Sequence, residues 1–139
     1  MTSRRIALWA SIAAATFWTA KSIAIGLAGG LDKSPLEAPL FFLGLISFVV
    51  AVVVLGVALT PGRHASVRVA AGVGGFVVGF ALTLLVDAAV GSFEAADAER
   101  HWVWTEFNLW VVALAALTLA VVVARPREES ADAELVLHA

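Results

Sequence analysis

The sequence has 139 residues, of which 61% are hydrophobic and only 14% are charged, and its formal net charge is −2. Soluble domains are about half apolar and about a quarter charged, so this composition predicts an integral membrane protein. The lack of cysteine excludes disulfides and thiolate metal sites. The nine basic residues are scattered along the chain rather than gathered in a patch, which argues against nucleic-acid binding.

Four apolar stretches are each long enough to cross a bilayer as a helix, which takes roughly 20 residues. The first follows the basic lead MTSRR, but Phe17 and Trp18 stand where a cleavable signal peptide would need small residues. Glycine, proline and charged loops separate the stretches. The predicted spans are residues 6–28, 40–60, 67–93 and 102–124.

The predicted fold class is an all-α integral membrane protein, a four-transmembrane-helix bundle over residues 1–126 with an acidic tail over 127–139. Basic residues beside spans mark the cytoplasmic side. The side of the two termini carries six: Arg4, Arg5, Arg63, Arg68, Arg125 and Arg127. The other side carries only Lys33 and Arg100. We therefore expect both termini and the tail in the cytoplasm.

Composition also suggests where the protein resides. Arginine outnumbers lysine seven to two, and alanine and valine are abundant, which is typical of GC-rich bacterial genomes. We therefore expect a multi-pass protein of the bacterial inner (plasma) membrane.

Small residues recur at helical spacing in the second and third spans. The third span has a ridge with one member at every fourth position: Ala71, Gly75, Gly79, Thr83 and Asp87. The second span has a seam that includes Gly44, Ser47 and Ala51. Small side chains let helices approach closely in a membrane, so we expect the small members of both series to pack against other helices.

Three charged residues lie more than one residue inside the ends of the spans, namely Lys21, Asp87 and Glu106. At about 1.5 Å of rise per residue they lie roughly 12, 9 and 6 Å below the outer ends of their helices. Because the lysine side chain is long, these depths allow a shared charge cluster in the outer leaflet, and they leave open which carboxylate pairs with Lys21. Thr83 lies one turn inward of Asp87 and could hydrogen-bond it or a water.

Aromatic residues accompany two of these charges. Trp18 precedes Lys21 by three residues, so its ring could hold the ammonium. Trp102 and Trp110 flank Glu106 at four-residue spacing and predict an aromatic wall on its face. Asn108 lies about 200° round the helix from Glu106, so we expect it to make a different contact, with another subunit or with headgroups.

Ionisable groups inside a membrane are expensive, so each needs a partner or a function. One interpretation is a structural ion pair within a non-enzymatic accessory or scaffold protein. The alternative is a small proton- or cation-coupled permease that uses Asp87 and Glu106. Independent snorkelling of each group to the interface is a third interpretation.

No pattern in the chain predicts catalysis or a bound cofactor. The three histidines lie outside the middle of the spans, which argues against haem, and no hydrolase, metalloprotease or phosphate-binding motif occurs. We therefore expect no enzymatic activity, no metal and no cofactor. The expected surroundings are the lipid bilayer and a homo-oligomer or larger membrane complex, with Gly72 and Gly91 as candidate contacts.

Overall fold

The computed structural model describes residues 2–93 and 102–125, and every regular element in these ranges is an α-helix. The helices are α1 (Ser3–Ala28), α2 (Glu37–Ala58), α3 (Ala65–Phe93) and α4 (Trp102–Ala124). All four are long and apolar enough to cross a membrane. The predicted set of four apolar helices is therefore confirmed, whereas their direction across the bilayer stays a prediction. The tail over 127–139 and the basic residues Arg100 and Arg127 lie outside the described residues.

The first helix ends where its glycine pair predicts. Gly29 has φ 80° and ψ 28°, a left-handed conformation that glycine adopts at little cost. The amide of Gly30 donates to the Ile25 carbonyl at 3.0 Å and that of Gly29 to the Gly26 carbonyl at 3.3 Å. These bonds satisfy carbonyls that the end of the helix would otherwise leave free, so the chain turns there.

Three helices begin earlier than the apolar pattern predicts. The first begins at Ser3 rather than residue 6 and the third at Ala65 rather than residue 67. The second begins at Glu37 rather than residue 40, so Pro39 lies inside the helix and does not stop it. A proline in the first turn removes no helical hydrogen bond, because the first four amides of a helix have no partner within it.

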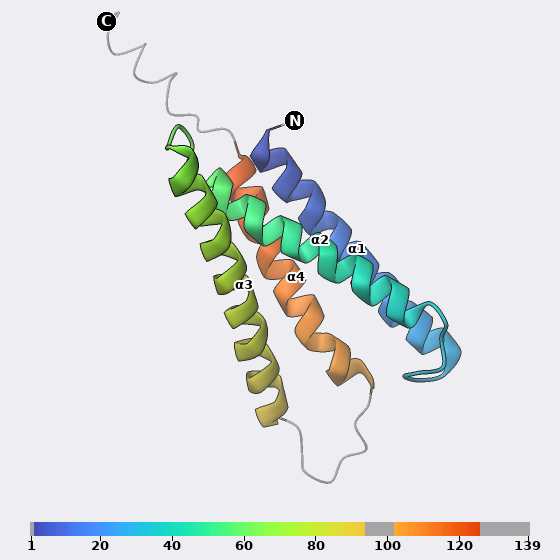
Figure 1. Cartoon of the computed structure of the whole chain (residues 1–139). Coiled ribbons are helices and arrows are strands. Elements are labelled where there is room, and N and C mark those ends of the chain that lie inside the picture. The colour runs from blue at the N-terminus through green and yellow to red at the C-terminus, as the bar shows by residue number, and fades with distance from the viewer. Residues whose placement is uncertain (1, 94–101, 126–139) are drawn as a thin grey trace, which may run out of the picture.

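The bundle has a tight three-helix part and a peripheral fourth helix. The antiparallel helices α1 and α2 form a hairpin, α4 packs against α1, and α3 packs mainly on α2 (Figure 1). The main core cluster comes from α1, α2 and α4: Ala14, Trp18, Phe48, Val52, Val112, Ala113 and Ala116. Among residues 65–92 of α3, whose burial the structure describes, only Gly72 and Gly79 are buried.

Helices α2 and α3 cross with their backbones in contact. A methyl group added at Gly56 of α2 would overlap the carbonyl oxygen of Ala71 on α3. One added at Gly75 would overlap the carbonyl oxygen of Val52, and one at Gly79 would lie 2.9 Å from a Val52 methyl group. The small residues of the α3 ridge thus face α2, and they meet Gly56, which the predicted seam does not include.

The seam of α2 faces the core and α1. Ala51 is fully buried, and Gly44 packs so closely on the Trp18 indole that a methyl group there would overlap it. Ser47 is half-buried, and its hydroxyl donates to the Leu43 carbonyl of its own helix at 2.8 Å.

The prediction that Gly72 contacts another subunit is wrong, because α2 of the same chain already covers the face of α3 on which Gly72 lies. A methyl group at Gly72 would lie 3.3 Å from a Val57 methyl group and 3.4 Å from one of Val53. Gly91, the other candidate contact, has open space around it, with no atom within 4 Å of an added methyl group.

Candidate functional site

The centre of the candidate site is a buried ion pair between α1 and α4. The Lys21 ammonium donates to Glu106 Oε1, and the side chains are only 9% and 1% exposed respectively. Lys21 lies on the buried face of α1 together with Trp18 and Ile25, at the spacing of successive helical turns. The packing of this face against α4 brings the ammonium to the carboxylate.

Ser22 completes the coordination of the carboxylate. Its hydroxyl, 3% exposed as a residue, lies 3.2 Å from Glu106 Oε2 and 3.0 Å from the Trp18 carbonyl oxygen, so its one hydrogen has two acceptors. Both oxygens of Glu106 therefore have a donor from α1. Charges buried in this way need such additional hydrogen bonds, because ion pairing alone does not replace the lost hydration.

The aromatic partner of the ammonium comes from α2 rather than α1. Lys21 Nζ lies 5.5 Å from the ring centroid of Phe41, within the range of a cation–π contact. The expected partner, Trp18, instead donates its indole N–H to the Phe41 carbonyl at 3.3 Å and packs on the ring of Phe48. The ion pair and these contacts tie α1, α2 and α4 together at one level of the bundle.

Asp87 does not join this cluster, so the prediction of a site shared by all three charges is wrong. Its Oδ1 accepts a hydrogen bond from Asn108 Nδ2 at 2.9 Å, and Asp87 itself is exposed. The physical reason is the position of α3, which packs on α2 and makes no contact with α1 in the described ranges. The carboxylate therefore meets α4 on a different face from Glu106, and Asn108 has a partner within the chain.

Thr83 makes no hydrogen bond to Asp87 in the described structure. Its hydroxyl donates to the Gly79 carbonyl of its own helix at 2.9 Å. Side chains of serine and threonine inside helices commonly satisfy themselves in this way, on the carbonyl four residues earlier. Thr83 thus lies on the α3 ridge, but not in the charge site.

The structure describes the surroundings of the tryptophans that flank Glu106, while the aromatic wall itself stays a prediction. Trp102 packs against α1, because a methyl group at Gly26 would lie 3.3 Å from its ring. Trp110 is partly buried, and its indole nitrogen is buried without a hydrogen-bond partner in the described structure. Trp102 therefore packs on α1 one helical turn from Glu106.

A polar cavity reaches the site from the loop between α1 and α2. It measures about 330 Å³, and Lys21, Asp32 and Glu37 are among its lining residues. Glu37 is engaged in holding the loop, because its Oε2 accepts the backbone amide of Asp32 at 2.8 Å. The ammonium of the ion pair thus borders a cavity whose carboxylates come from outside the apolar stretches.

Ser22, Phe41 and the Asp87–Asn108 bond were not found by sequence reasoning. Ser22 carries a usable signal, because it lies beside the only charge of its span and its hydroxyl can donate to a carboxylate. Phe41 carries none, since many apolar positions of the second span could equally face Lys21.

Comparison with protein-family models, curated proteins and solved structures found no match to this chain. The site geometry is therefore the basis for a functional proposal. It contains one buried ion pair with both carboxylate oxygens satisfied and, apart from it, one exposed carboxylate that binds an amide.

Proposed function

We propose that this chain is a small, non-enzymatic protein of a bacterial inner membrane, where it serves as an accessory or scaffold bundle in a homo-oligomer or a larger complex. In this proposal both termini lie in the cytoplasm. The lipid bilayer surrounds the four helices. The observation that supports this proposal most directly is the hydrogen bonding of Glu106. Lys21 and Ser22 each donate to one of its two carboxylate oxygens. A carboxylate neutralised in this way is suited to holding helices together rather than to exchanging ions.

The position of α3 supports the same proposal. This helix contributes little to the core, and its ridge packs on α2, with fewer contacts to α4. Its in-span carboxylate, Asp87, is exposed and has Asn108 as its hydrogen-bond partner. A carboxylate facing lipid is costly, so a neighbouring protein chain is a more favourable environment for this face.

The test is ion flux through purified protein in liposomes that contain a pH-sensitive dye. For a scaffold, proton and monovalent-cation flux should equal that of empty liposomes at every gradient applied. The protein must first be shown to be inserted and folded, by protease protection and by its helical circular dichroism. Flux above the empty-liposome level that disappears in Asp87→Asn would contradict the scaffold proposal.

The second candidate is a small proton- or cation-coupled permease. Two observations favour it: the exposed carboxylate of Asp87 and the polar cavity that reaches Lys21 from the loop between α1 and α2. In this case a cation or proton would bind at Asp87, and the Lys21–Glu106 pair would separate during transport. Asp87→Asn and Glu106→Gln should then both abolish flux, while Lys33→Gln, an exposed loop change, should not.

A further inference from the structure

Arginines from different helices gather at the end of the bundle that carries the N-terminus. Arg4 of α1 and Arg125, which follows α4, line a cavity of about 380 Å³. Its remaining wall is largely apolar and includes Leu59, Val122 and Val123. The cavity therefore combines two guanidinium groups with a hydrocarbon surface.

These two guanidinium groups have no acidic partner among the described residues. The ion pair found among the described residues joins Lys21 to Glu106, in the membrane-compatible part of the bundle and away from these arginines. Two like charges that line one cavity favour the binding of an anion between them. Arginine suits a phosphate in particular, because its planar donors match two phosphate oxygens at once.

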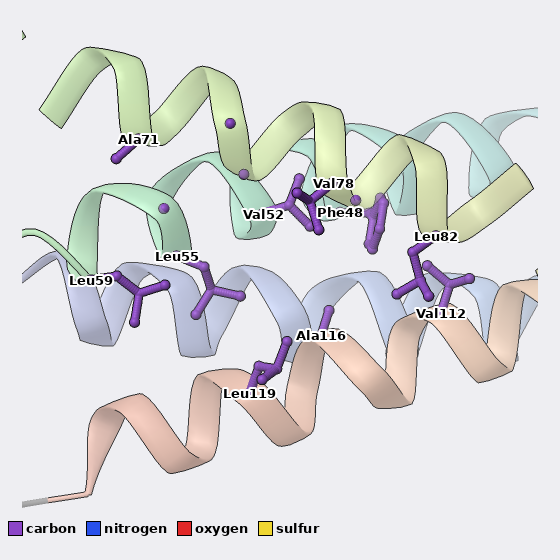
Figure 2. Close-up of a pocket in the computed structure, with 14 residues that line it drawn as sticks. Phe48, Val52, Leu55, Leu59, Ala71, Val78, Leu82, Val112, Ala116 and Leu119 are labelled. Atoms are coloured by element: carbon purple, nitrogen blue, oxygen red, sulfur yellow. The ribbon is translucent and has the colours of Figure 1, made fainter. Parts of the chain in front are cut away.

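An apolar groove adjoins this cavity and runs along the bundle. The groove measures about 290 Å³ and lies between α2, α3 and α4, with Leu59, Leu119 and Val112 among its labelled lining residues (Figure 2). Leu59 lines both the groove and the arginine cavity, so the two adjoin at this residue. From Leu59 to Phe48 the groove follows α2 for about 16 Å, a length that accommodates much of an extended acyl chain.

We propose that this surface is a binding site for one anionic glycerophospholipid. Its phosphate lies between Arg4 and Arg125, and one acyl chain passes Leu59 into the groove. The charge of the cavity selects the headgroup, because the ammonium of a zwitterionic choline lipid is repelled by the same arginines that attract its phosphate. The groove favours a lipid over free phosphate, because only a lipid has an acyl chain to fill the groove while its phosphate occupies the arginine cavity.

The experiment is native mass spectrometry of the full chain in detergent with equimolar phosphatidylglycerol and phosphatidylcholine. Wild type should retain phosphatidylglycerol preferentially. R4Q/R125Q should bind it about thirtyfold more weakly, from about 1 kcal/mol per basic residue near a membrane surface. R5Q/R63Q is the matched control: it removes two arginines that line neither cavity and should keep the preference.

A second pair of variants tests the groove. Gly74 lines it, and an added methyl group there meets no atom within 4 Å, so Gly74→Leu should fill the groove without disturbing the helix contacts. It should weaken binding of both lipids and leave binding of glycerol phosphate, which has no acyl chain, unchanged. Gly91→Leu, on the same helix and equally free of neighbours, should change neither.

Two results would overturn the proposal. One is equal phosphatidylglycerol binding by wild type and R4Q/R125Q, or an equal loss in R5Q/R63Q, since the cavity arginines would then have no special part. The other is a loss of glycerol phosphate binding in R4Q/R125Q with no effect of Gly74→Leu on lipid, which would identify a site for free phosphate instead.

Discussion

Lys21 and Glu106 form a buried ion pair between α1 and α4, although 85 positions separate them in the sequence. The pair joins the first and last helices, which the chain itself connects only through two other helices. Because each charge is almost fully buried, neither can be removed without leaving the other unpaired. The pair therefore closes the three-helix part of the bundle.

We expect Lys21→Met and Glu106→Gln each to lower the free energy of unfolding by about 3–5 kcal/mol, since either change breaks a buried pair and leaves its partner buried without a counter-charge or full set of donors. The double variant should lose less than the sum of the two. Unfolding by denaturant in detergent micelles measures all three values as a double-mutant cycle.

Lys33→Met is the control for the loss of a lysine, because Lys33 is exposed and its ammonium binds only the Gly29 carbonyl among the described residues. Its effect should stay within about 0.5 kcal/mol. Strictly additive effects in the cycle would show that Lys21 and Glu106 stabilise the bundle independently, contrary to the pairing described here.

The contact between α2 and α3 should be sensitive to any side chain at Gly56. Gly56→Ala puts a methyl group against the Ala71 carbonyl, so the helices must separate, and overpacking of this kind costs about 1–3 kcal/mol. Gly74→Ala is the matched control, because its methyl group meets nothing. Thermal unfolding in detergent compares the two, and similar melting temperatures would mean that α3 is not held at Gly56.

Asp87 should contribute to association rather than to folding. Since it is exposed and its partner is the neutral Asn108, Asp87→Leu should leave the free energy of unfolding unchanged or raise it, because a carboxylate no longer faces lipid. Self-association in liposomes, measured by energy transfer between labelled copies, should fall. Leu85→Ala, an exposed change on the same helix, serves as control.

A large loss of stability in Asp87→Leu would instead show that the Asp87–Asn108 hydrogen bond stabilises the fold of a single chain. Unchanged self-association would remove Asp87 from the contact between copies.

The predicted orientation is testable with single cysteines, because the chain has none of its own. Lys33→Cys lies in the predicted outer loop and Arg63→Cys in the predicted inner loop. A membrane-impermeant maleimide should label the first in intact cells and the second only after permeabilisation. The opposite labelling would reverse the assigned topology, which rests on the distribution of basic residues beside the spans.

The sequence by itself determined the approximate extent of the four helices found in residues 2–93 and 102–125. A bilayer requires about 20 apolar residues per crossing, so the four apolar stretches identify four helices without reference to their neighbours. Local chemistry also determined the end of α1, since Gly29 adopts a left-handed conformation there. The spacing of Ala71, Gly75 and Gly79 indicated a packing ridge, because helical periodicity is a property of one segment.

Only the tertiary structure decided which charge pairs with which. Depth along a span is one coordinate, and depth alone excluded neither Asp87 nor Glu106 as the partner of Lys21. The choice depends on which helices are neighbours and which faces they turn to each other. Because α3 packs on α2 and α4 packs on α1, Glu106 reaches Lys21, while Asp87 meets Asn108.

The same reason explains the contacts that the sequence left undetermined. Gly56 meets α3, and Phe41 lies under the ammonium, only because consecutive helices of the chain cross at those levels. The residue pattern of one helix indicates which of its faces can be buried. Which other helix covers that face depends on how all the helices pack together. The sequence therefore determined the elements and their apolar character, and the packing of α3 against α2 and of α4 against α1 decided the site.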